Sequence, residues 1–202
     1  MRHTQTRVGS LYTTAGQRKY LSADERARFL AKAKQALRTD VRTLCLTLAY
    51  TGCRISEALA ITGTSVESEA GFISIRCLKK RNGAVVFREV PVPEELFECL
   101  VQVVNESAPP CRLWRLSRCR AWQLVKAVMK EAAIGEGPHA TPKGLRHGFG
   151  MHAIRSGVPL NLVQRWLGHA SMATTAIYLQ AMGIEEREIA ARMWTPRQSR
   201  HV

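Results

Sequence analysis

The segment spanning residues 141–180, TPKGLRHGFGMHAIRSGVPLNLVQRWLGHASMATTAIYLQ, gathers residue types suited to chemistry on a phosphate group. Arginine and lysine neutralise anionic oxygens, histidine donates hydrogen bonds or moves protons, and tyrosine can act as a nucleophile. The segment therefore indicates a site that holds a phosphate and attacks it. Its chemically competent members are Lys143, Arg146, His147, His169 and Tyr178.

Phosphodiester transfer without a metal ion needs an in-line nucleophile, cations that neutralise the non-bridging oxygens, and an acid for the departing 5′ oxygen. Arginine forks suit the second task because they grip phosphate with two hydrogen bonds and stay charged. Tyrosine suits the first because its phenolate is a better leaving group than an alkoxide, which keeps the covalent step reversible. The sequence shows no acidic cluster and no Cys/His set with metal-ligand spacing. A two-metal nuclease is therefore poorly supported, and no cofactor is expected.

The charge balance points to an anionic partner. The chain carries 30 Lys and Arg against 16 Asp and Glu, a net charge of +14, and they are scattered over its whole length. Such a basic folded surface most commonly binds nucleic acid. A basic surface kept for solubility is the alternative. An anionic membrane is a weaker candidate because no segment has the pattern of a basic amphipathic anchor.

Cysteine usage and hydropathy indicate the compartment. None of the six cysteines forms a Cys-x-x-Cys pair, so no zinc site is expected. Cys45, Cys53 and Cys99 lie in apolar patterns typical of buried thiols in a reducing compartment. The N-terminal segment is polar, unlike a signal peptide, and no run of eighteen apolar residues occurs. We expect a cytoplasmic protein with no membrane partner.

Apolar residues at helical spacing predict a mainly α-helical domain. The capping-box sequence SADE predicts a helix that starts at Ser22, and Thr51-Gly52 ends the next one. Arg54 then lies at the start of a short third helix. It is interpreted either as a structural partner of Glu57 or as a functional guanidinium held rigidly. Further helices are expected over 94–104, 118–133, 142–156, 159–167 and from Ser171 through Tyr178.

Between residues 72 and 92 the apolar period changes to two, which predicts a β-hairpin with an Asn-Gly turn. Pro91 and Pro93 confine its second strand to a sheet edge. Lys79 and Lys80 lie in the turn, either as a solvated tip or as a lysine that reaches a phosphate. The absence of alternating strands and helices gives a fold class that is mainly α with a small sheet.

The helix over 118–133 is expected to bury Trp122. Basic residues on and before it could face a duplex, although solvated charge is the alternative for each one. They are Arg112, Arg115, Arg118, Arg120 and Lys126.

Three segments, TGCRISEALAIT, KGLRHGFGMHAIRSG and WLGHASMATTAIYL, resemble in order the motif boxes of the tyrosine recombinase (phage integrase) family. LKKRNG…REVPVP resembles the catalytic-lysine hairpin of that family, and the match covers about residues 20–180. The resemblance implies the family's catalytic-domain fold. It also implies site-specific recombination of double-stranded DNA through a covalent 3′-phosphotyrosyl intermediate, by four protomers and without a metal or other cofactor.

The resemblance assigns roles to individual residues. Arg54 and Arg146 are similar to the two arginines that clamp the scissile phosphate. His169 resembles the histidine that bonds the phosphate, and Tyr178 resembles the nucleophile. Glu57 resembles the acidic residue that supports the first arginine.

Lysines carry the remaining assignments. Lys79 resembles the hairpin lysine that acts as general acid, and Lys80 is the alternative because register in a turn varies. Lys143 stands where the family usually has histidine. It keeps a donor and a charge but moves a proton less easily near neutral pH. His147 is interpreted as a packed or supporting residue.

The resemblance divides the chain into three parts. Residues 1–20 are expected to form a flexible basic arm, 21–182 the catalytic domain, and 183–202 a helix and basic tail exchanged between protomers. Most family members place a core-binding domain before the catalytic one, so this chain resembles the short stand-alone type. Two alternative functions remain: a type IB topoisomerase-like enzyme that relaxes DNA as a monomer, and a non-catalytic DNA-binding accessory protein.

Overall fold

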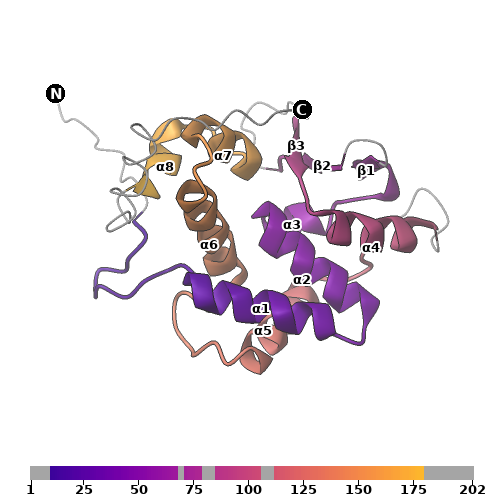
Figure 1. The fold of residues 1–202 in the computed structure, drawn as a ribbon, viewed down its shortest axis with the longest axis horizontal. Coiled ribbons are helices and arrows are strands. Elements are labelled where there is room, and N and C mark those ends of the chain that lie inside the picture. Colours follow the sequence, from indigo (N-terminus) through magenta and orange to yellow (C-terminus); the bar gives the residue numbers. More distant parts are fainter. Residues whose placement is uncertain (1–9, 68–70, 79–84, 106–111, 180–202) are drawn as a thin grey trace, which may run out of the picture.

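The computed structural model describes residues 10–67, 71–78, 85–105 and 112–179. Within these ranges the protein is mainly α-helical with one small antiparallel sheet (Figure 1), as the sequence predicts. The elements are α1 (Ala23–Gln35), α2 (Thr39–Thr51), α3 (Ile55–Ala58), η1 (Gly63–Ser65), β1 (Val66–Glu67), β2 (Phe72–Arg76), β3 (Phe87–Pro91), α4 (Glu94–Asn105), α5 (Arg118–Glu131), α6 (Pro142–Arg155), α7 (Leu160–Leu167) and α8 (Met172–Ala176).

Local capping residues set most helix boundaries. The Ser22 side chain accepts a hydrogen bond from the backbone N–H of Glu25, and the Glu25 carboxylate accepts one from the backbone N–H of Ser22. This pair is the predicted capping box at the start of α1. The Ser117 side chain caps α5 by accepting a hydrogen bond from the backbone N–H of Arg120, and Gly52 ends α2 in the left-handed conformation with φ 60°. Glycine is suited to that position because it has no Cβ to clash with the following carbonyl.

The sheet has the order β1-β2-β3, with both pairs antiparallel. Ile73 pairs with Val90, and both are buried on the inner face together with Ile75. β3 is an edge strand, as Pro91 and Pro93 predicted, because proline cannot donate to a further strand. The short strand β1 was not predicted. The turn that carries the two hairpin lysines lies outside the described residues.

Helix α2 is the centre of the larger hydrophobic core, and Leu44 and Leu48 on it are fully buried. It contacts α1, α4, α5 and α6. α7 and α8 lie at one end of α6, while the sheet lies beside α3 and α4 (Figure 1). A second, smaller core forms around α6 and α7 and contains the side chain of Tyr178.

Two sequence expectations differ from the structure. Residues 10–20 do not extend as an arm: Tyr12 bridges Arg18, and Leu11 is buried in the smaller core. The rest of the predicted arm, residues 1–9, lies outside the described residues. Trp122 is 43% exposed instead of buried, and the Lys126 ammonium lies over its ring, 6.0 Å from the centroid.

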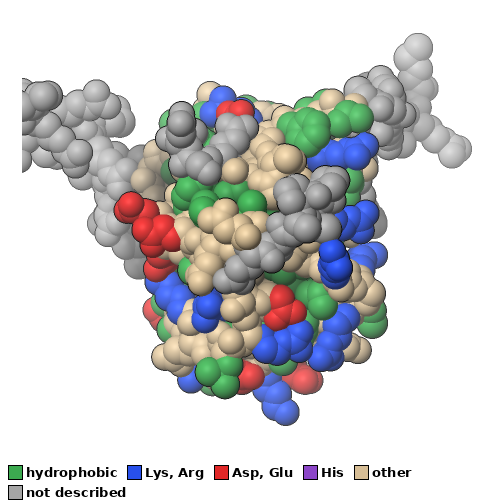
Figure 2. Space-filling view, turned by 90° about the vertical axis from the view of Figure 1, so that its right-hand side faces the viewer, with side chains coloured by type: hydrophobic (Ala, Val, Ile, Leu, Met, Phe, Trp, Pro, Cys, Tyr) green, Lys and Arg blue, Asp and Glu red, His purple; other side chains and the backbone are tan. Residues whose placement is uncertain are grey.

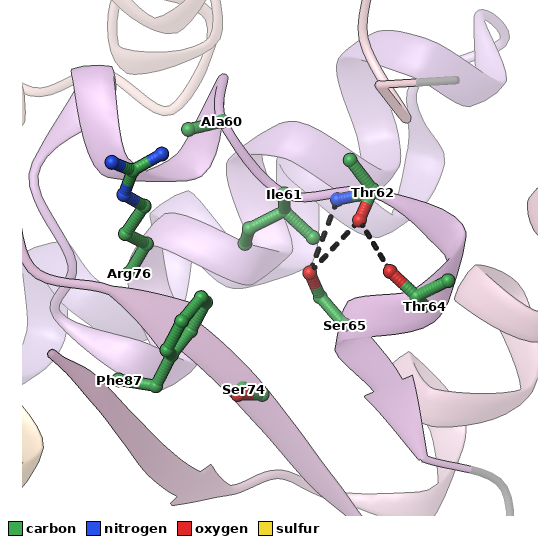
Figure 3. Close-up of a pocket in the computed structure, with 8 residues that line it drawn as sticks. All are labelled: Ala60, Ile61, Thr62, Thr64, Ser65, Ser74, Arg76 and Phe87. Atoms are coloured by element: carbon green, nitrogen blue, oxygen red, sulfur yellow. Dashed lines mark hydrogen bonds between the residues drawn. The ribbon is translucent and has the colours of Figure 1, made fainter. Parts of the chain in front are cut away.

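The described surface is basic, and Figure 2 shows Lys and Arg side chains spread across one face with Asp and Glu between them. A cleft of about 400 Å³ lies between η1 and the outer face of the sheet. Figure 3 shows Arg76 on one side of it and the hydroxyls of Thr62, Thr64 and Ser65 on the other, hydrogen-bonded to one another. None of the helices in the described ranges is long and apolar enough to cross a membrane.

Candidate active site

Tyr178 lies in the turn just after α8, two residues beyond the end of the helix at Ala176. The sequence placed it on the helix itself, which ends earlier. Its side chain has no exposed surface. The phenolic oxygen lies 3.1 Å from Nδ1 of His147, and the ring stacks against His169 with centroids 6.4 Å apart and an interplanar angle of 13°. Two histidines therefore enclose the tyrosine.

Gly150 on α6 makes room for the tyrosine ring. A Cβ at this position would lie 2.5 Å from Cζ of Tyr178, which is closer than real Cβ atoms come to any heavy atom. Gly150 has the ordinary helical backbone conformation, which any residue could adopt, so backbone conformation does not require a glycine here. The packing of Tyr178 against the helix backbone is therefore the physical reason for glycine in the middle of α6.

Burial raises the pKa of Tyr178 to about 12, although the charges of Arg146 and Arg54 act to lower it. Burial, together with the charges of Lys143 and Arg146, lowers the pKa of His147 to about 4. At neutral pH the phenol is therefore protonated and the imidazole is neutral, so each can bond the other without a charge. The wide separation of the two pKa values keeps the proton on Tyr178 in this buried position.

Arg146 is buried on α6 and bonds two backbone carbonyls. One guanidinium nitrogen donates to the Gly52 oxygen at 2.8 Å and the other to the Leu167 oxygen at 2.6 Å. Burial, followed by the charge of Arg54, lowers the pKa of Arg146 to about 10, which still leaves it charged at neutral pH. Among the described residues no carboxylate forms an ion pair with it. A rigid guanidinium held by carbonyls alone is suited to bind an anion.

Arg54 precedes α3 and is held by Glu57. The guanidinium donates to one carboxylate oxygen at 2.8 Å and the backbone N–H donates to the other at 2.9 Å. The Arg54 side chain is 34% exposed whereas that of Glu57 is 1% exposed. The predicted structural pair with Glu57 is therefore present, and it orients a guanidinium whose surface remains accessible. The functional role of Arg54 stays a prediction.

His169 follows Gly168, which ends α7 in the left-handed conformation with φ 65°. Its Nδ1 lies 2.9 Å from the hydroxyl of the buried residue Thr175, so the ring is fixed from the following helix. Burial and then the charges of Arg146 and Arg54 lower the pKa of His169 to about 3. The ring is thus neutral at physiological pH and can donate one hydrogen bond from Nε2 while Nδ1 faces Thr175.

The sequence profile of the Phage integrase family matches residues 19–183. The chain belongs to this family. The tyrosine recombinase XerD of Neisseria meningitidis serogroup B is 31% identical over 147 residues, which is 66% of this chain and 48% of that protein. The crystal structure of XerA recombinase has a TM-score of 0.71 at 27% identity, over 88% of this chain and 65% of that one. The family resemblance and the fold class predicted from the sequence are therefore confirmed.

A further solved structure shares the fold. XerH site-specific recombinase bound to its difH substrate in a pre-cleavage complex has a TM-score of 0.69 at 22% identity, over 91% of this chain and 60% of that one. At that identity the likeness concerns the fold alone. The chain spans about half the length of the curated relatives it matches.

The structure brings four of the six predicted site residues together. The charges of Arg54 and Arg146 act to lower the pKa of both His169 and Tyr178. Lys143 is exposed in the first turn of α6, and its charge reaches His147. Lys79, with its alternative Lys80, lies outside the described residues. None of the predicted site residues within the described ranges lines the cleft beside η1. Within the described ranges no group of His, Cys, Asp or Glu side chains could hold a metal ion.

Sequence reasoning missed two contacts at this integrase-family site. One is the bond between His147 and the Tyr178 hydroxyl, which no spacing rule indicates because the residues are 31 apart. The other is Arg88 on β3, whose guanidinium donates to Oε2 of Glu57 while that of Arg54 donates to Oε1. A signal for Arg88 existed: it lies two residues before Val90, so the period of two places both on the buried face.

Proposed function

We propose that this chain is a site-specific DNA recombinase that cleaves and rejoins DNA strands through Tyr178. The observation that carries the proposal is the convergence of Arg54, Arg146 and His169 around one tyrosine. Together they supply two guanidiniums and a neutral imidazole donor next to a nucleophile, and they come from segments far apart in the sequence. This set matches what a metal-free phosphoryl transfer needs.

In the proposed step the phenolic oxygen of Tyr178 forms a bond to the scissile phosphorus, and the bond from phosphorus to the 5′ oxygen breaks. Tyr178 loses its proton, for which Nδ1 of His147 is the closest described acceptor. The 5′ oxygen gains a proton from Lys79, with Lys80 as the alternative, and leaves as a hydroxyl. Arg54, Arg146, His169 and Lys143 stabilise the phosphate oxygens. Reversal by another strand's 5′ hydroxyl rejoins the DNA, so no energy source or cofactor is used.

The buried phenol must move before it can attack. Tyr178 has no exposed surface, so a phosphate cannot approach it along the line of attack while it lies against Gly150. The charges of both arginines already act to lower its pKa, and release from the apolar core removes the opposing effect of burial. We therefore propose that DNA binding is coupled to an outward shift of the turn after α8.

The proposed partner is double-stranded DNA at specific sites. The basic exposed surface supports this partner, and exposed residues around the start of α5 contribute to it: Arg112, Arg118 and Arg120. Four protomers would act on two sites, with residues 183–202 exchanged between them, because the sequence over 184–194 has the apolar stripe of a docking helix. Such an enzyme would work in the cytoplasm. Deletion of 183–202 should abolish synapsis of two sites, and full recombination by the truncated chain would contradict the exchange.

The cleavage chemistry is tested with a nicked suicide duplex, selected for binding from a random-sequence pool, that traps the covalent product. The wild type should form a protein–DNA adduct that resists denaturant, and Tyr178→Phe should form none. Tyr50→Phe is the matched control, because the Tyr50 hydroxyl bonds Glu95 on α4 and not a predicted site residue. An adduct in Tyr178→Phe, or none in the wild type, would contradict the proposal.

A further inference from the structure

The Arg88 side chain hydrogen-bonds three segments near the site. Its Nε donates to the Trp166 carbonyl at 2.6 Å, one terminal nitrogen donates to Glu57 at 2.7 Å, and the other donates to Sγ of Cys77 at 3.2 Å. The side chain is 3% exposed, so it cannot reach a bound phosphate from this position.

The contact with Glu57 fixes Arg54. The Glu57 carboxylate accepts hydrogen bonds from two guanidiniums, that of Arg54 on Oε1 and that of Arg88 on Oε2. Burial acts to raise the pKa of Glu57, but the charge and hydrogen bond of Arg88, together with the smaller effects of Arg54, keep the pKa below its usual range. The carboxylate that orients Arg54 therefore stays ionised mainly because Arg88 is beside it.

The contact with Trp166 fixes His169. The Trp166 carbonyl belongs to the last turn of α7, and the next carbonyl, of Leu167, accepts a hydrogen bond from Arg146. Two buried guanidiniums thus hold successive carbonyls at the end of the helix that His169 follows. A Cβ on Gly168 would lie 3.0 Å from a terminal nitrogen of Arg88, so the turn packs directly on this side chain. These bonds also satisfy carbonyls that a helix end leaves without partners.

The third contact, with Cys77, connects Arg88 to the hairpin. Cys77 follows β2 and Arg88 belongs to β3, so the two residues flank the turn that contains Lys79 and Lys80. The backbone N–H of Cys77 also donates to the Val86 carbonyl at 2.8 Å, which closes the base of the hairpin. Arg88 thereby links the base of the lysine hairpin to the segments of Arg54 and His169.

We infer that Arg88 is a positioning residue for strand cleavage, which sets the geometry of Arg54 through Glu57 and of His169 through the end of α7. The inference rests on the proposed recombinase function. Arginine is required in this role because a guanidinium has donors in three directions in one plane, whereas a lysine ammonium is a single point that cannot reach all three acceptors.

The test measures the rate of adduct formation on the nicked duplex for Arg88→Met and Arg88→Lys, each with DNA affinity and a urea unfolding curve. Arg88→Met should cleave about 100-fold more slowly, the size expected for misplaced catalytic groups, with DNA affinity changed by less than about threefold. Arg38→Met is the matched control, because Arg38 is an exposed arginine paired with Asp40 at the start of α2. It should cleave at the wild-type rate.

The pH profile separates positioning from a merely structural role. Without Arg88 the pKa of the buried Glu57 should rise, because burial raises it and the main opposing charge is gone, so Glu57 should take up a proton at a higher pH than in the wild type. The residual cleavage by Arg88→Met should therefore decline at a higher pH than wild-type cleavage does as the pH is lowered, and Glu57→Gln in the same variant should remove this decline. Arg88→Lys, which keeps the charge, should retain the wild-type profile with about tenfold slower cleavage.

The outcomes distinguish the two levels of the proposal. A wild type without adduct contradicts the recombinase function itself. An active wild type with an equally fast, folded Arg88→Met variant contradicts the role of Arg88. A slow Arg88→Met variant whose pH profile matches the wild type also contradicts it, because Arg88 would then contribute only to folding. If Arg88→Met does not fold, the Arg88→Lys variant decides. Cleavage by folded Arg88→Lys at the wild-type rate would overturn the inference.

Discussion

Replacement of Gly150 by alanine tests whether the proposed nucleophile is buried as the structure shows. The added Cβ would lie 2.5 to 2.8 Å from three ring atoms of Tyr178, so the ring or the helix must shift. Such overpacking of a core costs about 1–3 kcal/mol. Alanine in place of glycine within a helix contributes about 1 kcal/mol in the opposite direction. Gly150→Ala should therefore be neutral or destabilising by up to about 2 kcal/mol in the wild-type background.

The sign should reverse when the tyrosine is absent. In the Tyr178→Ala background the space beside Gly150 is empty, so only the helix preference remains and Gly150→Ala should stabilise by up to about 1 kcal/mol. The free energies of unfolding of the four proteins, from urea titrations followed by circular dichroism, give the coupling between the two positions. We expect a coupling of about 1–3 kcal/mol.

The reasoning would be refuted by additive effects. If Gly150→Ala changes the free energy of unfolding equally in both backgrounds, within about 0.5 kcal/mol, the two residues do not touch. The packing of the phenol ring against α6 would then be contradicted, and with it the basis for an outward shift of the turn after α8.

Two further predictions concern stability. The pKa of Glu25 is about 2 in the folded protein, lowered chiefly by its hydrogen bond to Arg18, against 4.5 in the unfolded chain. Its ionised form therefore stabilises the protein above about pH 5, and this contribution is lost as the pH falls to about 2. Glu25→Gln should lower the unfolding midpoint at pH 7 and match the wild type near pH 2; an equal difference at both pH values would contradict this. Gly52→Ala should lower the free energy of unfolding by about 2–5 kcal/mol in urea titrations. The reason is that φ is 60° and the added Cβ would collide with the Phe149 ring. A loss below about 1 kcal/mol would show that the Phe149 ring moves aside at little cost.

Helix boundaries could be predicted from the sequence because capping bonds join residues a few positions apart. Ser22, Gly52 and Ser117 illustrate this, since each acts on a backbone group of its own helix end. Tyr178 shows where local signals fail. The sequence permits α8 to continue, yet the helix ends at Ala176 and the tyrosine turns into the smaller core. That end depends on packing against α6, far away in the chain.

The site residues were found from motifs that resemble a family, whereas their supporting residues were not. Arg88 shares a face with Val90, so its burial could be read from the strand period, but its partners lie on α3 and α7 and follow from the tertiary fold. Leu11 likewise follows a polar segment with no apolar period, and its burial depends on contacts with the smaller core. Trp122 matched the apolar period of α5, yet it faces outward over Lys126.

The central claim is that Tyr178 becomes covalently joined to DNA, and mass spectrometry of the trapped adduct tests it most directly. Cleavage after Arg and Lys releases a peptide of residues 166–187, in which Tyr178 is the only tyrosine. After nuclease digestion of the adduct, we predict that this peptide carries a 3′-linked nucleotide remnant on Tyr178. A remnant on any other residue, or an adduct that leaves this peptide unmodified, would contradict the account.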